Sequence, residues 1–118
     1  MLNEWSKQIR DRAGDVCEIC GGTEKIQSHH LLKKEIFHQY YGELMNGVCL
    51  CLFCHKWGKD SIHQNPIAAI YKLAGKQNKQ LEWSVQHAYD KPLTMKEVNY
   101  QSIYESLTKI EEDKPTET

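Results

Sequence analysis

The 118-residue sequence contains no apolar run long enough to cross a lipid bilayer, so no membrane-spanning helix and no membrane partner are expected. Its first residues, Met-Leu-Asn-Glu-Trp, lack the basic flank and the apolar block of a secretory signal peptide. We therefore expect a reducing, cytoplasmic location. The sequence also shows no internal repeat and no sign of a second domain, and its length suits one small domain.

A strong net charge is also missing, because 15 basic and 16 acidic residues leave a formal charge of −1. Four acids and one lysine lie in the segment 111–118, which leaves about +2 on residues 1–110. This charge is far below the basic footprint of many nucleic-acid-binding proteins. A nucleic-acid partner must therefore be argued from the residues of a site.

The cysteine count is five, an odd number that fits badly with a complete disulfide framework. Four of the cysteines form two Cys-x-x-Cys pairs, Cys17/Cys20 and Cys51/Cys54. Two such pairs can ligate one tetrahedral zinc ion, and in a reducing compartment metal ligation is favoured over disulfides. The histidine-rich surroundings disfavour an iron–sulfur centre. We predict a structural zinc, with Cys49 as a small buried hydrophobe.

Three histidines near these pairs need a separate explanation, because a closed Cys₄ site requires none. His29 and His30 are adjacent on a predicted strand, where neighbouring side chains point to opposite sides, so their roles must differ. A ββ-hairpin packed on the following helix would return His55 to this pair. Neutral imidazole suits both metal ligation and general base catalysis. The alternative is that all three are neighbours of the zinc site or surface residues.

Hydrophobic periodicity, turn residues and helix caps predict an α+β fold. In chain order, the expected elements are a helix over 3–13, a strand over 25–32, a loop over 33–44 with one helical turn at 35–39, a strand over 48–52, a helix from about 54, a helix over 66–75, and a helix from the capping box at 94–97 to about 110. Residues 81–89 alternate in polarity, which favours a half-buried strand, although a helical face also fits. Asn46-Gly47 predicts a turn or hairpin, and the three tryptophans are expected in the core.

Residues 5–63 resemble the HNH endonucleases of the ββα-metal superfamily, in their zinc-knuckle phage or bacterial type. The similarity extends over about half of the chain, and Asn46 stands nine residues before His55, which suits the family's middle Asn and final His. The residues that carry it are the lead-in from Trp5 to Arg12, the knuckle Cys17-Glu-Ile-Cys20-Gly21, the run Ser28-His29-His30, Asn46, and the run Leu50-Cys51-Leu52-Phe53-Cys54-His55-Lys56-Trp57.

The resemblance implies a metal-dependent DNA endonuclease that hydrolyses phosphodiester bonds in one strand or both, leaving 3′-hydroxyl and 5′-phosphate ends. It implies that His30 is the general base and that Asn46 positions it by tying the loop between the strands. It also implies that His29 and His55 bind one catalytic divalent ion (Mg²⁺, Mn²⁺, Ni²⁺ or Zn²⁺). The expected partner is DNA, with a homodimer or a phage or host protein as further possibilities.

The resemblance divides the chain into three parts: residues 1–66 as an HNH nuclease domain with its structural zinc and N-terminal helix, residues 67–110 as a helical extension of the same domain, and residues 111–118 as a disordered acidic tail. Many relatives carry a histidine four residues after the final motif histidine, where this chain has Lys59. His63 is a third candidate, as a ligand, a phosphate contact or a helix-entry residue, and the last of these is favoured.

Four lysines near the site in sequence are weak candidates for contacts with DNA phosphates: Lys33, Lys34, Lys56 and Lys59. Each of them, taken alone, is better explained as a solvated surface residue. Two alternative functions stay open. One is a catalytically silent, zinc-stabilised DNA-binding module, and the other is a zinc-stabilised protein-interaction domain. The complete His-His…Asn…His set favours the enzyme, because a binding module does not need all of these residues.

Overall fold

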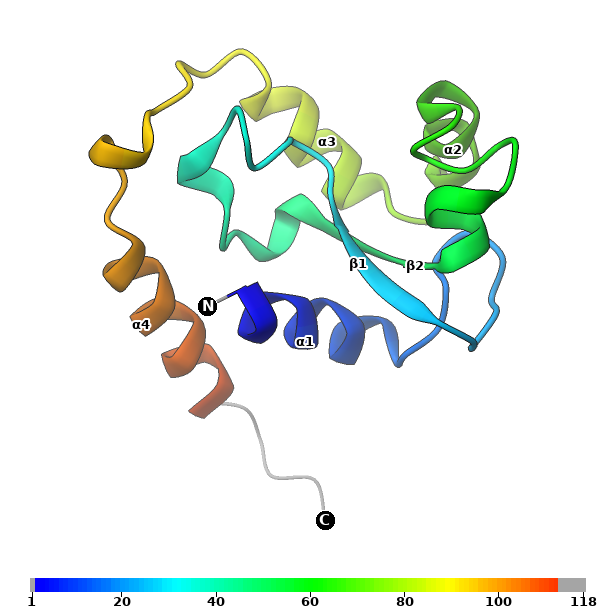
Figure 1. Ribbon diagram of the computed structural model, residues 1–118, viewed down its shortest axis with the longest axis horizontal. Coiled ribbons are helices and arrows are strands. Elements are labelled where there is room, and N and C mark those ends of the chain that lie inside the picture. The colour runs from blue at the N-terminus through cyan, green and yellow to red at the C-terminus, as the bar shows by residue number, and fades with distance from the viewer. Residues whose placement is uncertain (1, 113–118) are drawn as a thin grey trace.

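The computed structural model describes residues 2–112, and the elements are arranged around a small two-stranded sheet (Figure 1). The elements are α1 (Leu2–Ala13), β1 (Ile26–His30), β2 (Gly47–Cys51), a π-helix (Phe53–Trp57), α2 (Pro66–Leu73), α3 (Asn78–His87), α4 (Tyr100–Glu112), and short 3₁₀ helices at His38–Tyr40, Leu44–Asn46 and Met95–Glu97. The predicted α+β class is confirmed. None of the helices in residues 2–112 is long and apolar enough to cross a membrane.

The two strands pair antiparallel, with Ile26 opposite Cys51 and His30 opposite Gly47. Side chains alternate along β2, so Val48 and Leu50 join one buried cluster while Cys49 joins another on the opposite face. Every residue of β2 is therefore buried, although the sheet has only two strands. Both strands were predicted from the sequence to within two residues at each end.

Helix α1, predicted over residues 3–13, packs on the sheet (Figure 1), and its residues Trp5 and Ile9 are buried. The contact is close at Gly47, where an added Cβ would lie 2.5 Å from Ile9 Cδ1 and 2.7 Å from Trp5 Cζ2. Arg12 fastens the end of the helix by donating 2.7 and 2.6 Å hydrogen bonds to the carbonyls of Leu44 and Gly47. Gly47 is extended, with a φ of −131°, so close packing and not turn geometry requires this glycine.

Helix α2 covers the side of the sheet that carries Val48 and Leu50, using Ala69 and Leu73. It starts at Pro66, as predicted, and the side chain of Asn65 caps it by accepting a 3.2 Å hydrogen bond from the amide of Ala68. The predicted C-terminal extension therefore contributes to the same core as the sheet.

The strand favoured for residues 81–89 is wrong, because this segment lies mostly in helix α3. Gln80 and Ser84 are the buried residues of α3, and Trp83 packs edge-on against Tyr40 at a centroid distance of 5.0 Å. Val85 and Tyr89, which the alternating pattern placed inside, are 63% and 89% exposed. The alternation misled because the buried positions of this helix include the polar residues Gln80 and Ser84, while Val85 and Tyr89 face solvent.

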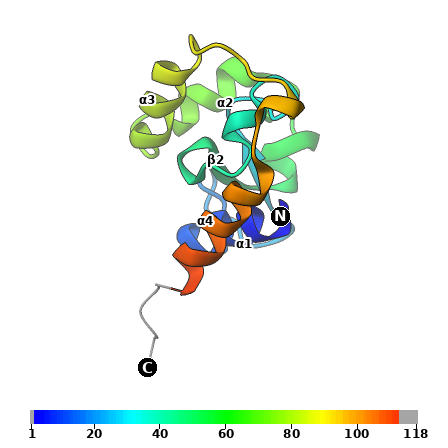
Figure 2. The ribbon, with the colours of Figure 1, turned by 90° about the vertical axis from the view of Figure 1, so that its left-hand side faces the viewer.

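The predicted start of the last helix is also displaced. The amide of Thr94 donates a 3.1 Å hydrogen bond to Glu97, as in a capping box, but this box opens only the short 3₁₀ helix. Helix α4 begins at Tyr100 and lies beside α1, with Leu107 1% exposed (Figure 2). It continues to Glu112, so the first two residues of the predicted disordered tail are helical. Residues 113–118 lie outside the described part of the chain.

Candidate metal centres

Within residues 2–112, two groups of side chains could each hold a metal ion. The first group consists of the four predicted cysteines, whose sulfur atoms all lie within 4.8 Å of one another: Cys17, Cys20, Cys51 and Cys54. None of them forms a disulfide. The set matches the Cys₄ ligands of a structural zinc ion, and such sites contribute directly to folding free energy.

Each cysteine pair is shaped by its own backbone. In the first knuckle, Gly21 adopts a φ of +78°, which glycine tolerates best, and its amide donates a 2.9 Å hydrogen bond to the carbonyl of Cys17. The amides of Cys20 and Cys54 approach the sulfurs of Cys17 and Cys51 at 3.5 Å. Burial opposes ionisation of Cys17, but neighbouring amides outweigh it and lower the pKa of this thiol to about 7. A lowered pKa favours the thiolate that a metal requires.

The fifth thiol, Cys49, is fully buried and lies outside this group, as predicted. Burial raises its pKa to about 12, because the thiolate would lose its hydration. Its backbone does bind the first knuckle, since Glu18 accepts a 2.7 Å hydrogen bond from the Cys49 amide.

The second group consists of His29, His55 and His63, again with ring nitrogens within 4.8 Å of one another. His29 Nδ1 lies 3.1 Å from His55 Nε2, and His63 Nε2 lies 2.9 Å from the same atom. Three imidazoles from a strand, the π-helix and the following loop thus converge on one point.

The position of His63 depends on a chain reversal after the π-helix. The amides of Ile62 and His63 donate hydrogen bonds of 2.9 and 3.1 Å to the carbonyls of Cys54 and His55. These bonds set the ring of His63 beside that of His55, although the two residues are eight positions apart in the sequence. The favoured sequence interpretation, a helix-entry residue, does not describe this placement.

Gln27 gives His55 a defined tautomer, and the sequence analysis did not identify it. Its side-chain oxygen lies 2.6 Å from His55 Nδ1, so Nδ1–H donates and Nε2 retains a single lone pair. His29 and His63 both approach that one lone pair, which can accept from only one of them. A divalent ion would satisfy all three nitrogens, so these residues fit a metal. Gln27 precedes His29 by two residues on β1, so the two side chains point to the same side of the strand, and this spacing could have indicated Gln27 as part of the site.

The half-buried His29 and the buried His55 both favour the neutral form. Burial lowers the pKa of His29 to about 3, with further lowering by His55 and His63. Burial likewise lowers the pKa of His55 to about 4. Neutral imidazoles are the form that binds a metal ion.

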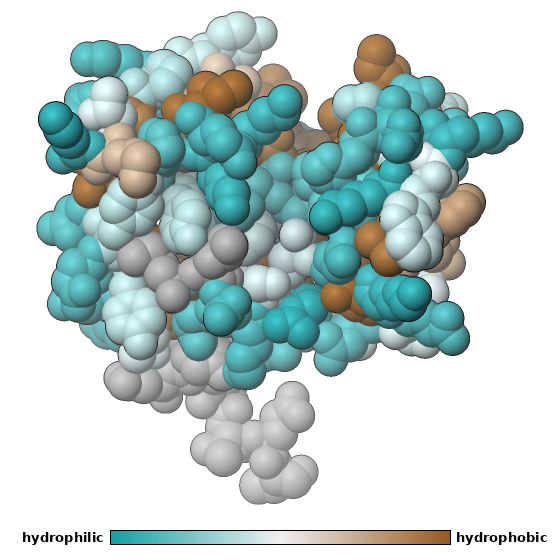
Figure 3. Space-filling model, in the orientation of Figure 1, coloured by the Kyte–Doolittle hydropathy of each residue, from teal (hydrophilic) through white to brown (hydrophobic). Residues whose placement is uncertain are grey.

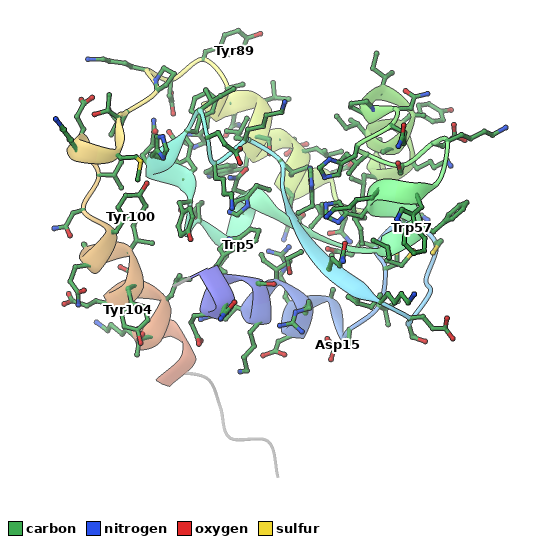
Figure 4. The ribbon with its side chains drawn as sticks, in the orientation of Figure 1. Trp5, Asp15, Trp57, Tyr89, Tyr100 and Tyr104 are labelled. Atoms are coloured by element: carbon green, nitrogen blue, oxygen red, sulfur yellow. The ribbon has the colours of Figure 1, made fainter. Side chains whose placement is uncertain are left out.

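His30 points to the other side of the strand, as predicted, and is held between two rings. It stacks on Trp5 with centroids 3.7 Å apart, and on Tyr41 at 5.9 Å; Figure 4 shows Trp5 between α1 and the strands. His30 Nε2 lies 2.9 Å from the Tyr41 carbonyl, so Nε2–H donates and Nδ1 keeps its lone pair. Burial lowers the pKa of His30, so its neutral form is favoured.

Asn46 is fully buried and links the two ends of the loop 31–46. Its side-chain oxygen accepts a 2.7 Å hydrogen bond from the amide of Leu32. Its amide group donates to the carbonyls of Leu32 and Tyr40 at 3.0 and 3.2 Å. This arrangement is the loop tie that the family resemblance implied, while its role in catalysis stays a prediction.

The predicted lysines differ in their relation to the histidines. The positive charges of Lys33, Lys34 and Lys56 contribute to the lowered pKa of His29, His30 and His55, respectively. Lys59 has no such effect on these three groups. Lys34 is half-buried, and the other three lysines are exposed.

Two further histidines have partners that the sequence did not suggest. His38 Nδ1 lies 3.0 Å from the hydroxyl of Tyr100. His87 Nδ1 lies 2.7 Å from a carboxylate oxygen of Asp90, and Tyr40 hydrogen-bonds to the same carboxylate. These contacts fasten the C-terminal segment to the loop that precedes β2.

Comparisons of this chain with protein-family models, curated proteins and solved structures gave no match.

Proposed function

We propose that this protein is a metal-dependent DNA endonuclease of the HNH type, in which β1, β2 and the π-helix form a ββα-metal core. The observation that carries the proposal is the convergence of three imidazole nitrogens on one point, next in sequence to a histidine held in a single tautomer. A binding module would need neither arrangement. In this proposal the four cysteines hold a structural zinc at the C-terminal end of β2, where Cys51 lies.

His30 acts as the general base. Its Nδ1 lone pair accepts a proton from the water that attacks phosphorus, while Nε2–H stays bonded to the Tyr41 carbonyl. That carbonyl stabilises the imidazolium that forms. Trp5 prevents rotation of the ring because the two planes lie within 3° of each other. Asn46 fixes the backbone of Tyr40 and Leu32, and so holds the Tyr41 carbonyl in place.

His29, His55 and His63 would hold the catalytic ion. A bound divalent metal supplies a Lewis acid that stabilises charge on the phosphoryl and leaving oxygens. Gln27 orients His55 for this role. Lys33, Lys34 and Lys56 would meet the DNA phosphates.

Plasmid nicking tests the proposal, with Mg²⁺, Mn²⁺, Ni²⁺ or Zn²⁺ added in turn to the zinc-loaded protein. His30→Ala should lower the cleavage rate about 100- to 10,000-fold, the usual contribution of a general base. His87→Ala is the matched control, since His87 lies on α3 and contacts Tyr40 and Asp90. Cleavage by His30→Ala at the wild-type rate would remove His30 as the base. DNA binding without cleavage under any of the four ions would indicate a silent binding module.

A further inference from the structure

Trp57 is exposed, although the sequence analysis placed it in the core. Its side chain is 66% exposed, and Phe53, four residues earlier on the same π-helix, is also 66% exposed. The Phe53 ring lies against the end of this helix, since a Cβ on Gly58 would be 2.8 Å from Phe53 Cε1. Two large aromatic rings therefore line the outer side of the helix whose inner side carries His55.

A groove separates these rings from the first cysteine knuckle. It has a volume of about 410 Å³ and is lined by residues 22–25 on one side and by residues 51–53 and Trp57 on the other. Figure 3 shows that hydrophilic side chains cover most of this face, while less hydrophilic ones gather on the side where Figure 4 labels Trp57.

A cation lies at this groove. The ammonium group of Lys25 is 5.2 Å from the centroid of the Trp57 ring, and Lys56 adjoins Trp57 in sequence. Such a cation is attracted by the face of the indole. An exposed indole with neighbouring positive charge suits a ligand that carries both a flat π-face and an anion.

We propose that Trp57 is a stacking platform for an unpaired nucleobase of the DNA substrate. The base stacks on the indole, Phe53 contacts its edge, and Lys25 and Lys56 neutralise the adjoining phosphates. The inference rests on the proposed nuclease function and names its substrate class: DNA with unpaired nucleotides beside the cut. Paired bases inside a duplex present no free face, so a base must leave the stack to occupy this site.

The platform belongs to the same short helix as one histidine of the proposed metal site. Trp57 follows His55 by two residues on one short helix, so the two side chains are held at a constant separation. Because the two side chains leave opposite sides of this helix, a strand with a phosphate at His29, His55 and His63 would pass around the helix to place a further nucleotide on Trp57.

Fluorescence anisotropy tests the inference, using a labelled oligo-dT strand and a blunt duplex of the same length with no catalytic metal added. Trp57→Ala should weaken binding of the single strand about 5- to 100-fold, the range of one base stacked on one aromatic ring. Trp57→Phe should retain most of the affinity because it keeps a π-face. The duplex affinity should change less than about twofold, since paired bases do not reach the ring.

Tyr89→Ala is the matched control, because Tyr89 is an exposed aromatic residue at the C-terminal end of α3, with 89% exposure (Figure 4). It should bind both DNAs like the wild type. Oligo-dT should also quench a part of the wild-type tryptophan emission that is missing from Trp57→Phe.

Equal losses for single strand and duplex, or no loss with Trp57→Ala, would overturn the inference and leave this surface to a protein partner. Wild-type protein that does not bind the single strand would overturn it as well. These binding measurements do not depend on cleavage. They can therefore reject base stacking on Trp57 without rejecting the nuclease function, and the reverse. If His30→Ala abolished plasmid nicking but Trp57→Ala left single-strand affinity unchanged, the stacking platform alone would be rejected.

Discussion

The indole of Trp5 and the imidazole of His30 lie parallel, with their centroids 3.7 Å apart and their planes within 3°. Trp5 is 1% exposed, and its Nε1–H donates a 2.9 Å hydrogen bond to the carbonyl of Glu43. The Trp5 side chain therefore packs in the core against β2, supports the ring of the proposed base His30, and fastens the loop that precedes β2.

Replacing Trp5 should affect both stability and cleavage. Trp5→Leu should reduce the free energy of unfolding by about 2–4 kcal/mol, because the smaller side chain leaves a cavity. Its folded molecules should also cleave DNA more slowly, since the ring of His30 loses its support. Urea unfolding and plasmid nicking measure the two effects. Leu107→Ala, in the same cluster, should cost similar stability and leave the rate of the folded fraction unchanged.

Replacing Gln27 should weaken metal binding at the histidines alone. In Gln27→Leu, His55 Nδ1 loses its acceptor, and such losses typically reduce metal affinity about 10- to 100-fold. Titration calorimetry with Ni²⁺ on zinc-loaded protein measures this change. Gln27→Glu keeps an acceptor oxygen and should restore binding. An unchanged Ni²⁺ affinity in Gln27→Leu would mean that Gln27 does not orient His55.

Removing one ligand of the cysteine group should abolish the zinc site. In Cys17→Ser, we expect loss of the bound zinc, measured by elemental analysis, together with loss of cooperative thermal unfolding. Cys49→Ala is the matched control, because Cys49 is buried outside the group and should leave zinc content unchanged. If Cys17→Ser kept both its zinc and its fold, a structural zinc at these cysteines would be excluded.

Acid should destabilise the fold through the buried histidines. The folded pKa of His29, about 3, and that of His55, about 4, lie below the ordinary value of 6.5. The unfolded chain therefore binds protons more readily, so the stability that these groups contribute is present above pH 6.5 and is lost as the pH falls toward 4. Urea unfolding at pH 7 and pH 5 measures the loss.

The variant with both His29→Gln and His55→Gln isolates this effect, since the cysteines take up protons over the same pH range in both proteins. Its stability should fall less between pH 7 and pH 5 than that of the wild type. Equal losses in the two proteins would assign the acid sensitivity to other groups.

The cysteine group shows how much of a site local sequence can predict. Each Cys-x-x-Cys pair builds its knuckle from adjacent residues, with Gly21 at positive φ and amides directed at sulfur. Asn65 and Pro66 likewise start α2 through contacts within one turn. Such features depend on neighbouring residues, so the sequence displays them. Residues 81–89 misled because two buried positions of α3, Gln80 and Ser84, are polar, and helical periodicity is recognised by apolar residues.

The sequence by itself determined the two cysteine knuckles, the paired strands, the opposite directions of His29 and His30, and the cap of α2, because short-range geometry governs each of them. Only the tertiary structure decided that His63 joins His29 and His55, that Gln27 orients His55, and that Trp57 faces solvent. The reason is that these outcomes depend on the chain reversal after the π-helix and on which side of that helix packs against β1. Contacts between distant segments set both, and no local pattern records them.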